Sequence, residues 1–157
     1  MTISGNTGGS VTAEGSLDHR GPLRISVCMA TRNGERFLRR QLETILAQLA
    51  PHDEVVISDD SSTDQTLEII RSFADPRIRL FAGNTFFSPI FNCENALRQA
   101  TGEIIVLADQ DDVWLEGKIA VIRERFAHGP AGPRLIALDG CVVDDAEQVT
   151  AGSIFAL

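Results

Sequence analysis

Three carboxylates, those of Asp109, Asp111 and Asp112, stand almost side by side in the stretch 109–114 (DQDDVW). The apolar run 104–108 leads directly into them. Because that run is short, continuous and β-branched, it predicts a buried strand. The carboxylates then follow its carboxyl end, which is where open α/β sheets bind ligands. Acidic groups this close repel one another unless a cation or hydrogen-bond donors offset them. The pattern therefore indicates a divalent metal and, with it, a phosphate ligand, although a solvated acidic turn that caps the next helix explains the same residues.

A second acidic pair occupies an equivalent place earlier in the chain. Asp59 and Asp60 directly follow the apolar run 54–58, which also predicts a strand. Ser62 or Thr63 is expected to cap the helix that follows. Capping needs only one short polar side chain, however, and two carboxylates precede it. This loop is therefore compatible with capping alone and with ligand binding.

Strand and helix patterns alternate around these two loops. Apolar runs predict strands at 24–29, 54–58, 77–82, 104–108 and 134–138. Helical periodicity predicts helices at 37–49, from 62 or 63 to 73, at 92–100 with Gly102 as a left-handed cap, and at 117–128. The residues 142–157 predict one more strand or an edge ribbon. The alternation predicts an α/β fold with a mostly parallel sheet and helices on both faces.

In a parallel sheet the two acidic loops lie on the same edge, so they place up to five carboxylates around one cleft. Such a cleft suits a nucleoside diphosphate, because a metal bridges the diphosphate oxygens and neutralises the charge of the leaving group. A carboxylate of the other loop can accept a hydrogen bond from the base or the ribose. The sequence has no P-loop or G-x-G-x-x-G, so we expect metal to hold the phosphate. It also has no G-x-S-x-G elbow and no helical H-E-x-x-H, which disfavours a hydrolase triad or a zinc protease.

Composition limits the remaining possibilities. The chain has 157 residues, which predicts one domain at 23–157 after a flexible, Gly/Ser/Thr-rich tail at 1–22. A net charge of −8 argues against nucleic acid and against electrostatic adhesion to anionic lipid. No apolar stretch reaches the length of a membrane span, and no secretory signal is visible. Three widely spaced cysteines fit reduced thiols, and we expect a cytoplasmic protein.

Four segments resemble the family 2 glycosyltransferases. Residues 25–48 (ISVCMATRNGERFLRRQLETILAQ) resemble the first strand, turn and helix of that family, and residues 54–70 (EVVISDDSSTDQTLEII) resemble its second strand and D-D-G-S-T-D loop. Residues 100–114 (ATGEIIVLADQDDVW) resemble its D-x-D region. The Q-D-D-V-W form is most similar to a bacterial branch with rhamnosyltransferase-like enzymes, as is the segment 135–147 (LIALDGCVVDDAE).

The resemblance implies a truncated, Rossmann-like α/β/α sandwich of the glycosyltransferase A type. It implies inverting, metal-dependent transfer of a sugar from a nucleoside diphosphate to an acceptor hydroxyl in bacterial surface-polysaccharide synthesis. The implied cofactor is Mg²⁺ or Mn²⁺. The implied partners are the nucleoside diphosphate sugar donor and a saccharide or lipid-linked saccharide acceptor. A lipid-linked acceptor is compatible with peripheral association of the protein with a membrane.

By the same resemblance, individual residues take roles in the cleft. Ala30 and Arg32 would line the base pocket, and Glu35 would face the nucleotide. Asp60 would contact the base, with Asp59 close by. Asp109 and Asp111 would lie at the ribose and the metal, with Asp111 the foremost metal ligand. Asp112 and Trp114 would shape the loop and its packing.

The chain departs from the family pattern at three places. Ala30 and Arg32 replace the usual proline and tyrosine of the first turn, and the arginine could pair with the diphosphate. Ser61 replaces the usual glycine. The sequence stops 43 residues after Trp114, whereas the family's catalytic base lies well beyond the D-x-D motif. The acids available there match no base motif: Asp139, Asp144, Asp145 and Glu147.

Two other functions remain to be compared with glycosyl transfer. One is a non-catalytic module that binds the nucleotide sugar or a partner protein, because inverting transfer needs a base. The other is a phospho-acceptor receiver domain, which expects an acidic pair after the first strand and a lysine after a late strand. Here the pair follows the second strand, and Lys118 is placed in a helix, so the receiver domain is disfavoured.

Overall fold

The computed structural model describes residues 23–128 and 132–155, so the predicted tail at 1–22 lies outside the described residues. Four parallel strands form the main sheet in the order β3-β2-β1-β4. They are β1 (Ile25–Thr31), β2 (Glu54–Asp59), β3 (Ile78–Phe81) and β4 (Ile104–Ala108). The helices are α1 (Leu38–Leu46), α2 (Thr66–Ser72), α3 (Pro89–Gln99) and α4 (Lys118–Ala127). A separate antiparallel ribbon pairs β5 (Val142–Val143) with β6 (Val149–Ala151).

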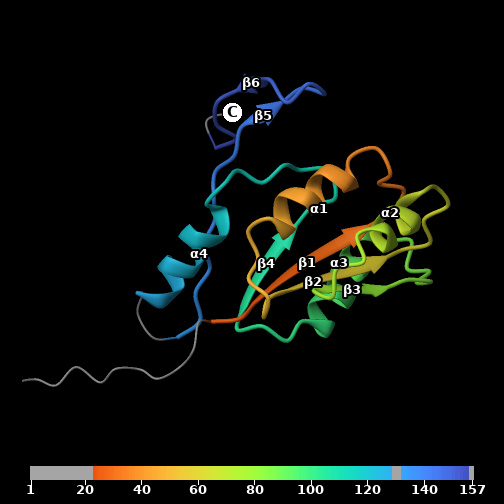
Figure 1. Ribbon diagram of the computed structural model, residues 1–157, viewed down its shortest axis with the longest axis horizontal. Helices are drawn as coiled ribbons and strands as arrows, with labels where there is room; N and C mark the ends of the chain where they lie inside the picture. The colour runs from red at the N-terminus through yellow and green to blue at the C-terminus, as the bar shows by residue number, and fades with distance from the viewer. Residues whose placement is uncertain (1–22, 129–131, 156–157) are drawn as a thin grey trace, which may run out of the picture.

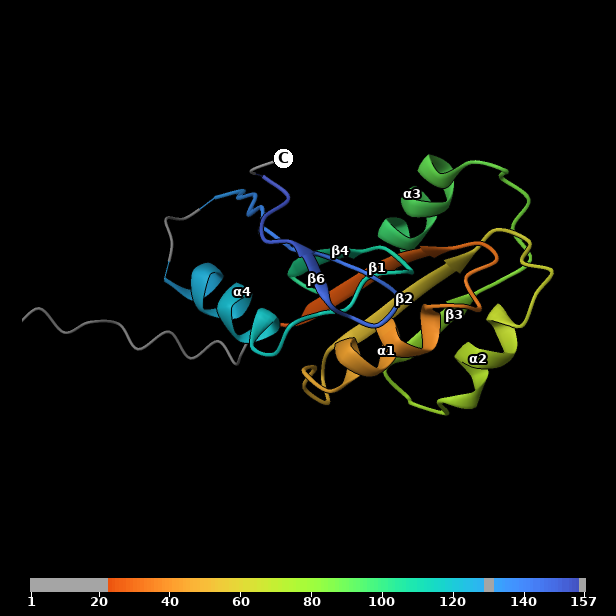
Figure 2. The same ribbon diagram turned by 90° about the horizontal axis from the view of Figure 1, so that it is seen from above.

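The helices cover the sheet in two layers (Figure 1), and Figure 2 shows α3 on one side with α1 and α2 on the other. The larger core cluster packs Leu42 of α1, Ile70 of α2 and Ile119 of α4 against one face of the sheet. A smaller cluster packs Ala96 of α3 against Cys28 and the opposite face. The predicted α/β/α architecture with a parallel sheet is therefore confirmed. No helix in the two described ranges is long and apolar enough to cross a membrane.

Strand β4 is covered on one face only, whereas the apolar run predicted a fully buried strand. Its residues alternate, with Ile104, Val106 and Ala108 buried. The intervening Ile105 and Leu107 are 42% and 61% exposed. The reason is the position of α3, which packs over β1 and β2 and leaves β4 at the open edge of the sheet.

The predicted strand at 134–138 is wrong. This segment forms no ladder, and Leu135 is 95% exposed. It lies instead beside β4, where its residues line a groove together with Ile105 and Leu107. An apolar run alone does not specify a pairing partner. The ribbon predicted within 142–157 is confirmed by β5 and β6.

Three predicted helices have an end that differs from the structure by three or more residues, and α1 ends at Leu46 rather than at 49. Helix α2 begins at Thr66, not after Ser62 or Thr63, and the Ser62 hydroxyl oxygen accepts the Asn33 amide at 2.9 Å instead of an amide of the helix. Helix α3 begins at Pro89 with Ser88 as its N-cap, earlier than the predicted 92. Gly102 is not among the glycines with positive φ.

Gly102 is needed for close packing instead. A Cβ atom there would lie 2.7 Å from the backbone nitrogen of Ser26 and 2.8 Å from the backbone oxygen of Arg24. The Ser26 nitrogen belongs to β1, and the Arg24 oxygen just before it accepts the Ile104 amide of β4, so neither can move without disturbing the sheet.

We predict that Gly102→Ala lowers the free energy of unfolding by about 1–3 kcal/mol, because the new methyl group overpacks backbone atoms. Gly152→Ala is the matched control, since a Cβ atom there meets nothing within 4 Å. Urea denaturation of both variants measures the difference. Equal stability of the two variants would contradict the packing role of Gly102.

A buried carboxylate holds the amino-terminal edge of the sheet together. Glu54 accepts hydrogen bonds from the Ser26 hydroxyl at 2.6 Å, from the Thr101 amide at 2.7 Å and from the Arg79 guanidinium at 2.7 Å. Burial opposes ionisation of this carboxyl, but the donors together outweigh burial and lower the pKa of Glu54 to about 2. The ionised side chain therefore links β1, β2, β3 and the loop before β4.

This lowered pKa predicts an acid-sensitive fold. A carboxyl whose pKa is lower in the folded chain stabilises the fold fully above its ordinary value of 4.5, and that stability is lost as the pH falls towards 2. In Glu54→Gln we expect a smaller loss of unfolding free energy between pH 6 and pH 2.5 than in the wild type. Denaturant titrations at several pH values test this. Parallel pH profiles for the two proteins would show that Glu54 is not the group responsible.

Candidate functional site

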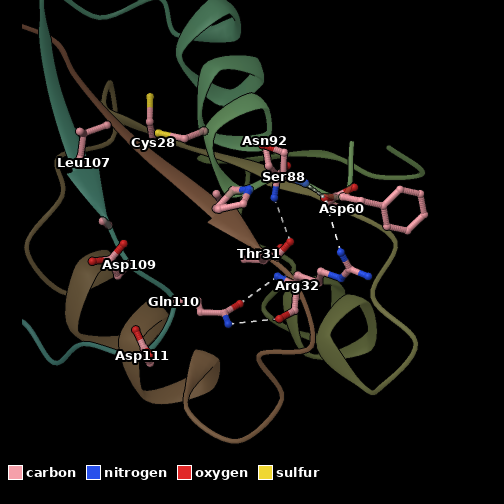
Figure 3. Close-up of a pocket in the computed structure, with 15 residues that line it drawn as sticks. Cys28, Thr31, Arg32, Asp60, Ser88, Asn92, Leu107, Asp109, Gln110 and Asp111 are labelled. Carbon is pink, nitrogen blue, oxygen red and sulfur yellow. Dashed lines mark hydrogen bonds and ion pairs between the residues drawn. The ribbon is translucent and has the colours of Figure 1, made fainter. Parts of the chain in front are cut away.

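A cavity of about 520 Å³ opens at the carboxyl-terminal edge of the sheet (Figure 3). It lies between the loops after β1, β2 and β4 and the first turn of α3. The predicted site residues among its lining are Ala30, Arg32, Asp60, Asp109 and Asp111. The two acidic loops therefore do reach the same cavity, as the parallel sheet predicted.

The β4 side of the cavity carries two unpaired carboxylates. Asp109 and Asp111 lie at the end of β4, across the cavity from Asp60 (Figure 3). Within the described residues, neither side chain takes part in a hydrogen bond or ion pair. The pKa of the neighbouring Asp112 is raised, first by partial burial and then by the Asp109 carboxylate, while Lys118 opposes the shift. Negative charge is thus concentrated at this wall, and Lys118 is the basic residue that interacts with it.

The β2 side is different, because hydrogen-bond donors of the protein surround the carboxylate of Asp59. Asp59 is fully buried and accepts hydrogen bonds from the Thr31 hydroxyl at 2.9 Å and from the Ser62 amide and hydroxyl at 3.0 and 2.5 Å. Asp59 is not among the lining residues. Its contacts join the end of β1 to the loop after β2, which is a structural role.

Asp60 lines the cavity and also anchors a distant segment. Its carboxylate accepts hydrogen bonds from the backbone amides of Phe86 at 2.7 Å and of Ser88 at 3.1 Å. The Arg32 guanidinium lies 4.0 Å from the same carboxylate. Asp60 therefore holds the loop before α3 against the mouth of the cavity.

Gln110, the middle residue of the D-x-D sequence, was not predicted as a site residue. Its side-chain oxygen accepts a hydrogen bond from the Arg32 amide at 3.0 Å, and its nitrogen donates to the Arg32 carbonyl at 3.2 Å. On the other side of the loop, buried Gln41 of α1 donates to the backbone carbonyl of Asp109 at 2.9 Å. Two glutamines therefore fix the loop that carries Asp109 and Asp111. Nothing in the sequence reveals these long-range contacts.

Glu35, which is expected to face the nucleotide, is not among the residues that line the cavity. Its carboxylate accepts a hydrogen bond from the Gln65 amide at 2.9 Å, just before α2. Its own amide donates to Asp64 at 3.0 Å. Trp114 is buried in the main core, with the Lys118 ammonium 4.2 Å from the centre of its ring.

The four acids considered for a catalytic base all lie outside the cavity lining. Asp145 and Glu147 of the ribbon pair with Arg36 and Arg40 of the α1 region. Asp144 accepts hydrogen bonds from two amides within its own turn, and Asp139 accepts them from the segment 153–155. Asp144 and Asp145 lie between the two strands of the exposed β5–β6 ribbon.

The profile of one known family, glycosyl transferase family 2, matches residues 26–147. The chain belongs to this family. The match runs from β1 through the ribbon turn, so it includes both acidic loops and the whole cavity.

Curated members of the family include enzymes named for transfer of sugars in bacteria. The chain is 30% identical over 111 residues to a GalNAc(5)-diNAcBac-PP-undecaprenol beta-1,3-glucosyltransferase of Campylobacter jejuni, which covers 69% of the chain and 36% of that protein. It is 36% identical over 104 residues to a dTDP-rhamnosyl transferase of Shigella flexneri, which covers 58% of the chain and 34% of that protein. The chain therefore spans little more than a third of the length of these relatives.

Solved structures show the same fold. A mannosyltransferase of Pyrobaculum calidifontis in complex with GDP-Man and Mn²⁺ superposes with a TM-score of 0.61 at 28% identity, over 67% of this chain and 33% of that one. S. aureus TarS 1-349 in complex with UDP-GlcNAc gives a TM-score of 0.63 over 77% of this chain and 40% of that one. At 23% identity, that second likeness concerns the fold alone.

The family and the Mn²⁺ of the mannosyltransferase suggest a divalent metal for this chain. Within residues 23–128 and 132–155, no group of three or more His, Cys, Asp and Glu side chains is arranged to hold one. Asp109 and Asp111 nonetheless present carboxylate oxygens that accept no hydrogen bond from the part of the chain that the structure describes. Mg²⁺ is commonly held by one or two carboxylates together with substrate phosphates. The pair therefore fits a metal that binds together with a diphosphate.

Asp59 is held by buried hydrogen bonds and Asp111 is not, and this difference can be tested without a ligand. We predict that Asp59→Ala lowers the free energy of unfolding by about 1–3 kcal/mol, because buried donors of Thr31 and Ser62 lose their acceptor. Asp111→Ala should change it by less than about 0.5 kcal/mol, since this exposed carboxylate accepts no hydrogen bond. Chemical denaturation at neutral pH compares the two variants. A larger loss of unfolding free energy in Asp111→Ala than in Asp59→Ala would contradict the structural role of Asp59.

Proposed function

We propose that this domain binds a nucleoside diphosphate sugar with Mg²⁺ or Mn²⁺ and transfers the sugar, with inversion, to an acceptor hydroxyl. The observation that carries the proposal is the arrangement of one cavity. Two carboxylates that have no hydrogen-bond or ion-pair partner among the described residues, those of Asp109 and Asp111, lie across it from Arg32 and Asp60. A diphosphate needs a cation on one side and a recess for its nucleoside on the other. This cavity has two carboxylates that could hold the cation and space for the nucleoside beside them.

The residues take distinct roles in this proposal. Asp111, with Asp109, holds the metal, and Asp109 also lies at the ribose. A bound metal neutralises the negative charge that develops on the leaving diphosphate. Arg32 adds a permanent positive charge at the mouth of the cavity. Ala30 lines the floor beneath the nucleoside.

Asp60 is proposed to accept a hydrogen bond from the base. Two backbone amides already donate to its carboxylate, one to each oxygen. An ionised carboxylate has about four acceptor positions, so it retains capacity for a ligand N–H. Glu35 and Asp59, both outside the lining, support this binding only through the loops that they hold in place.

The acceptor is proposed to be a saccharide or lipid-linked saccharide of a bacterial surface polysaccharide. The support is the name of the Campylobacter jejuni relative, which includes an undecaprenol diphosphate acceptor. The dTDP-rhamnosyl transferase relative supports a rhamnosyltransferase-like branch in the same way. We place the reaction in the cytoplasm, since Cys28, Cys93 and Cys141 are all free thiols.

A second candidate function is binding of the nucleotide sugar without transfer. It is favoured by the position of Asp139, Asp144, Asp145 and Glu147, since none of these four acids lines the cavity. A transfer assay with a panel of nucleotide sugars separates the two functions. Slow hydrolysis of the donor without transfer to a saccharide acceptor would favour binding alone.

We predict metal-dependent binding of nucleoside diphosphates to the wild-type protein. Calorimetric titration of UDP, GDP and dTDP, with and without Mn²⁺, should give a measurable affinity only with the metal for at least one of them. Asp111→Ala should weaken that binding by about tenfold or more, because the metal loses a ligand.

Asp145→Ala is the matched control for the titrations. Its carboxylate is 75% exposed and pairs with Arg36 away from the cavity, so its loss should leave the affinity unchanged. Binding that ignores the metal, or full affinity in Asp111→Ala, would overturn the proposed site.

A further inference from the structure

Phe87 is the one aromatic residue among those that line the cavity, within the described part of the chain. It lies in the loop between β3 and α3, and 66% of the side chain is exposed. Burial of a phenyl group normally stabilises a fold, so this exposed ring contributes little to packing. Its position at the cavity mouth therefore points to a ligand.

The backbone of Phe87 is strained. Its φ is +50°, in the left-handed region that bulky residues rarely adopt. Both neighbours of Phe87 are fixed by one buried carboxylate, since Asp60 accepts hydrogen bonds from the amides of Phe86 and Ser88. Such conformations persist where the surroundings impose them, and they cluster at ligand-binding sites. The loop thus holds the Phe87 ring at the cavity at a cost in conformational energy.

The ring already has a flat group against its face. The guanidinium carbon of Arg32 lies 5.0 Å from the ring centre. Arg32 is itself fixed at its backbone by Gln110, and its guanidinium lies 4.0 Å from Asp60. A planar cation and an aromatic ring therefore lie together beside the carboxylate proposed to contact the base.

We propose that Phe87 and Arg32 form the stacking platform for the base of the donor nucleotide. The inference rests on the proposed function and deepens it, because it assigns the residue that recognises the nucleoside rather than the phosphates. Arg32 stands where the family resemblance expects a tyrosine, so the first turn of this chain offers no aromatic ring. Phe87 supplies one from a different loop. Stacking tolerates different bases, since every base has a π face, so the platform favours nucleotides over phosphates without choosing between pyrimidine and purine.

The decisive experiment compares ligands with and without a base. UDP, GDP and inorganic pyrophosphate are titrated by calorimetry, each with Mn²⁺, into the wild type and into Phe87→Leu. We expect Phe87→Leu to weaken the better nucleotide by about fivefold or more, the range measured for loss of base stacking. Its affinity for pyrophosphate should be unchanged. Phe87→Tyr, which keeps a ring, should restore the nucleotide affinity.

Two further variants separate binding from folding. Phe91→Leu is the matched control, because Phe91 is 57% exposed on α3 and does not line the cavity. Its nucleotide affinity should equal that of the wild type. Phe87→Gly should weaken nucleotide binding without lowering the thermal unfolding midpoint, because glycine adopts positive φ without strain.

The outcomes distinguish this inference from the proposed function. An unchanged nucleotide affinity in Phe87→Leu, or an equal loss for pyrophosphate, overturns the stacking platform while leaving the metal site intact. A wild type that binds neither nucleotide nor pyrophosphate with Mn²⁺ overturns the proposed function itself, and the platform with it.

Discussion

The parallel pairing of β1 with a neighbour on each side determines where the two acidic loops meet. Thr31 lies opposite Asp59, so β1 and β2 end together. Strand β4 ends opposite Met29, two residues before β1 does. The loop after β4 therefore turns across the end of the central strand, where Gln110 reaches the backbone of Arg32. A slip of one residue in either pairing would exchange the faces of a strand, and the core at Met29 does not allow this.

Hydrogen-bond donors divide the acidic side chains into two groups. Buried Asp53, Glu54, Asp59 and Asp60 each accept hydrogen bonds from backbone or side-chain donors, as the cost of burying a charge requires. Asp109 and Asp111 have no such partners within the described residues and lie exposed in one loop. A chain with a net charge of −8 has little positive charge to spare for them. Under the proposed function, a metal ion that binds together with the diphosphate offsets this charge.

Local patterns predicted the frame of the fold but not its contacts. The four parallel strands and the meeting of the acidic loops follow from apolar runs and from the topology of α/β sheets. The failures share one cause, which is that tertiary partners decide them. Ser62 has the chemistry of a helix cap, yet its hydroxyl binds Asp59, and 134–138 has the pattern of a strand but no ladder. The hydrogen bond from the Gln65 amide to the Glu35 carboxylate is a further tertiary contact that no local pattern reveals.

Backbone strain lies mainly in the loops around the cavity and not in the strands of the sheet. Five described residues other than glycine have positive φ, and three of them lie in loops around the cavity: Asn33, Ser61 and Phe87. Ser61 adopts a φ of +58° where the family resemblance expects glycine, so this substitution keeps a conformation that serine disfavours. The Ser61 hydroxyl bonds the Asn84 carbonyl, and the Asn84 amide donates to the carbonyl of Asp59 at 3.1 Å. The buried apolar faces of the regular strands stabilise the fold and offset the conformational energy of these loops. The strain is concentrated where a ligand is expected and is absent from the central strands.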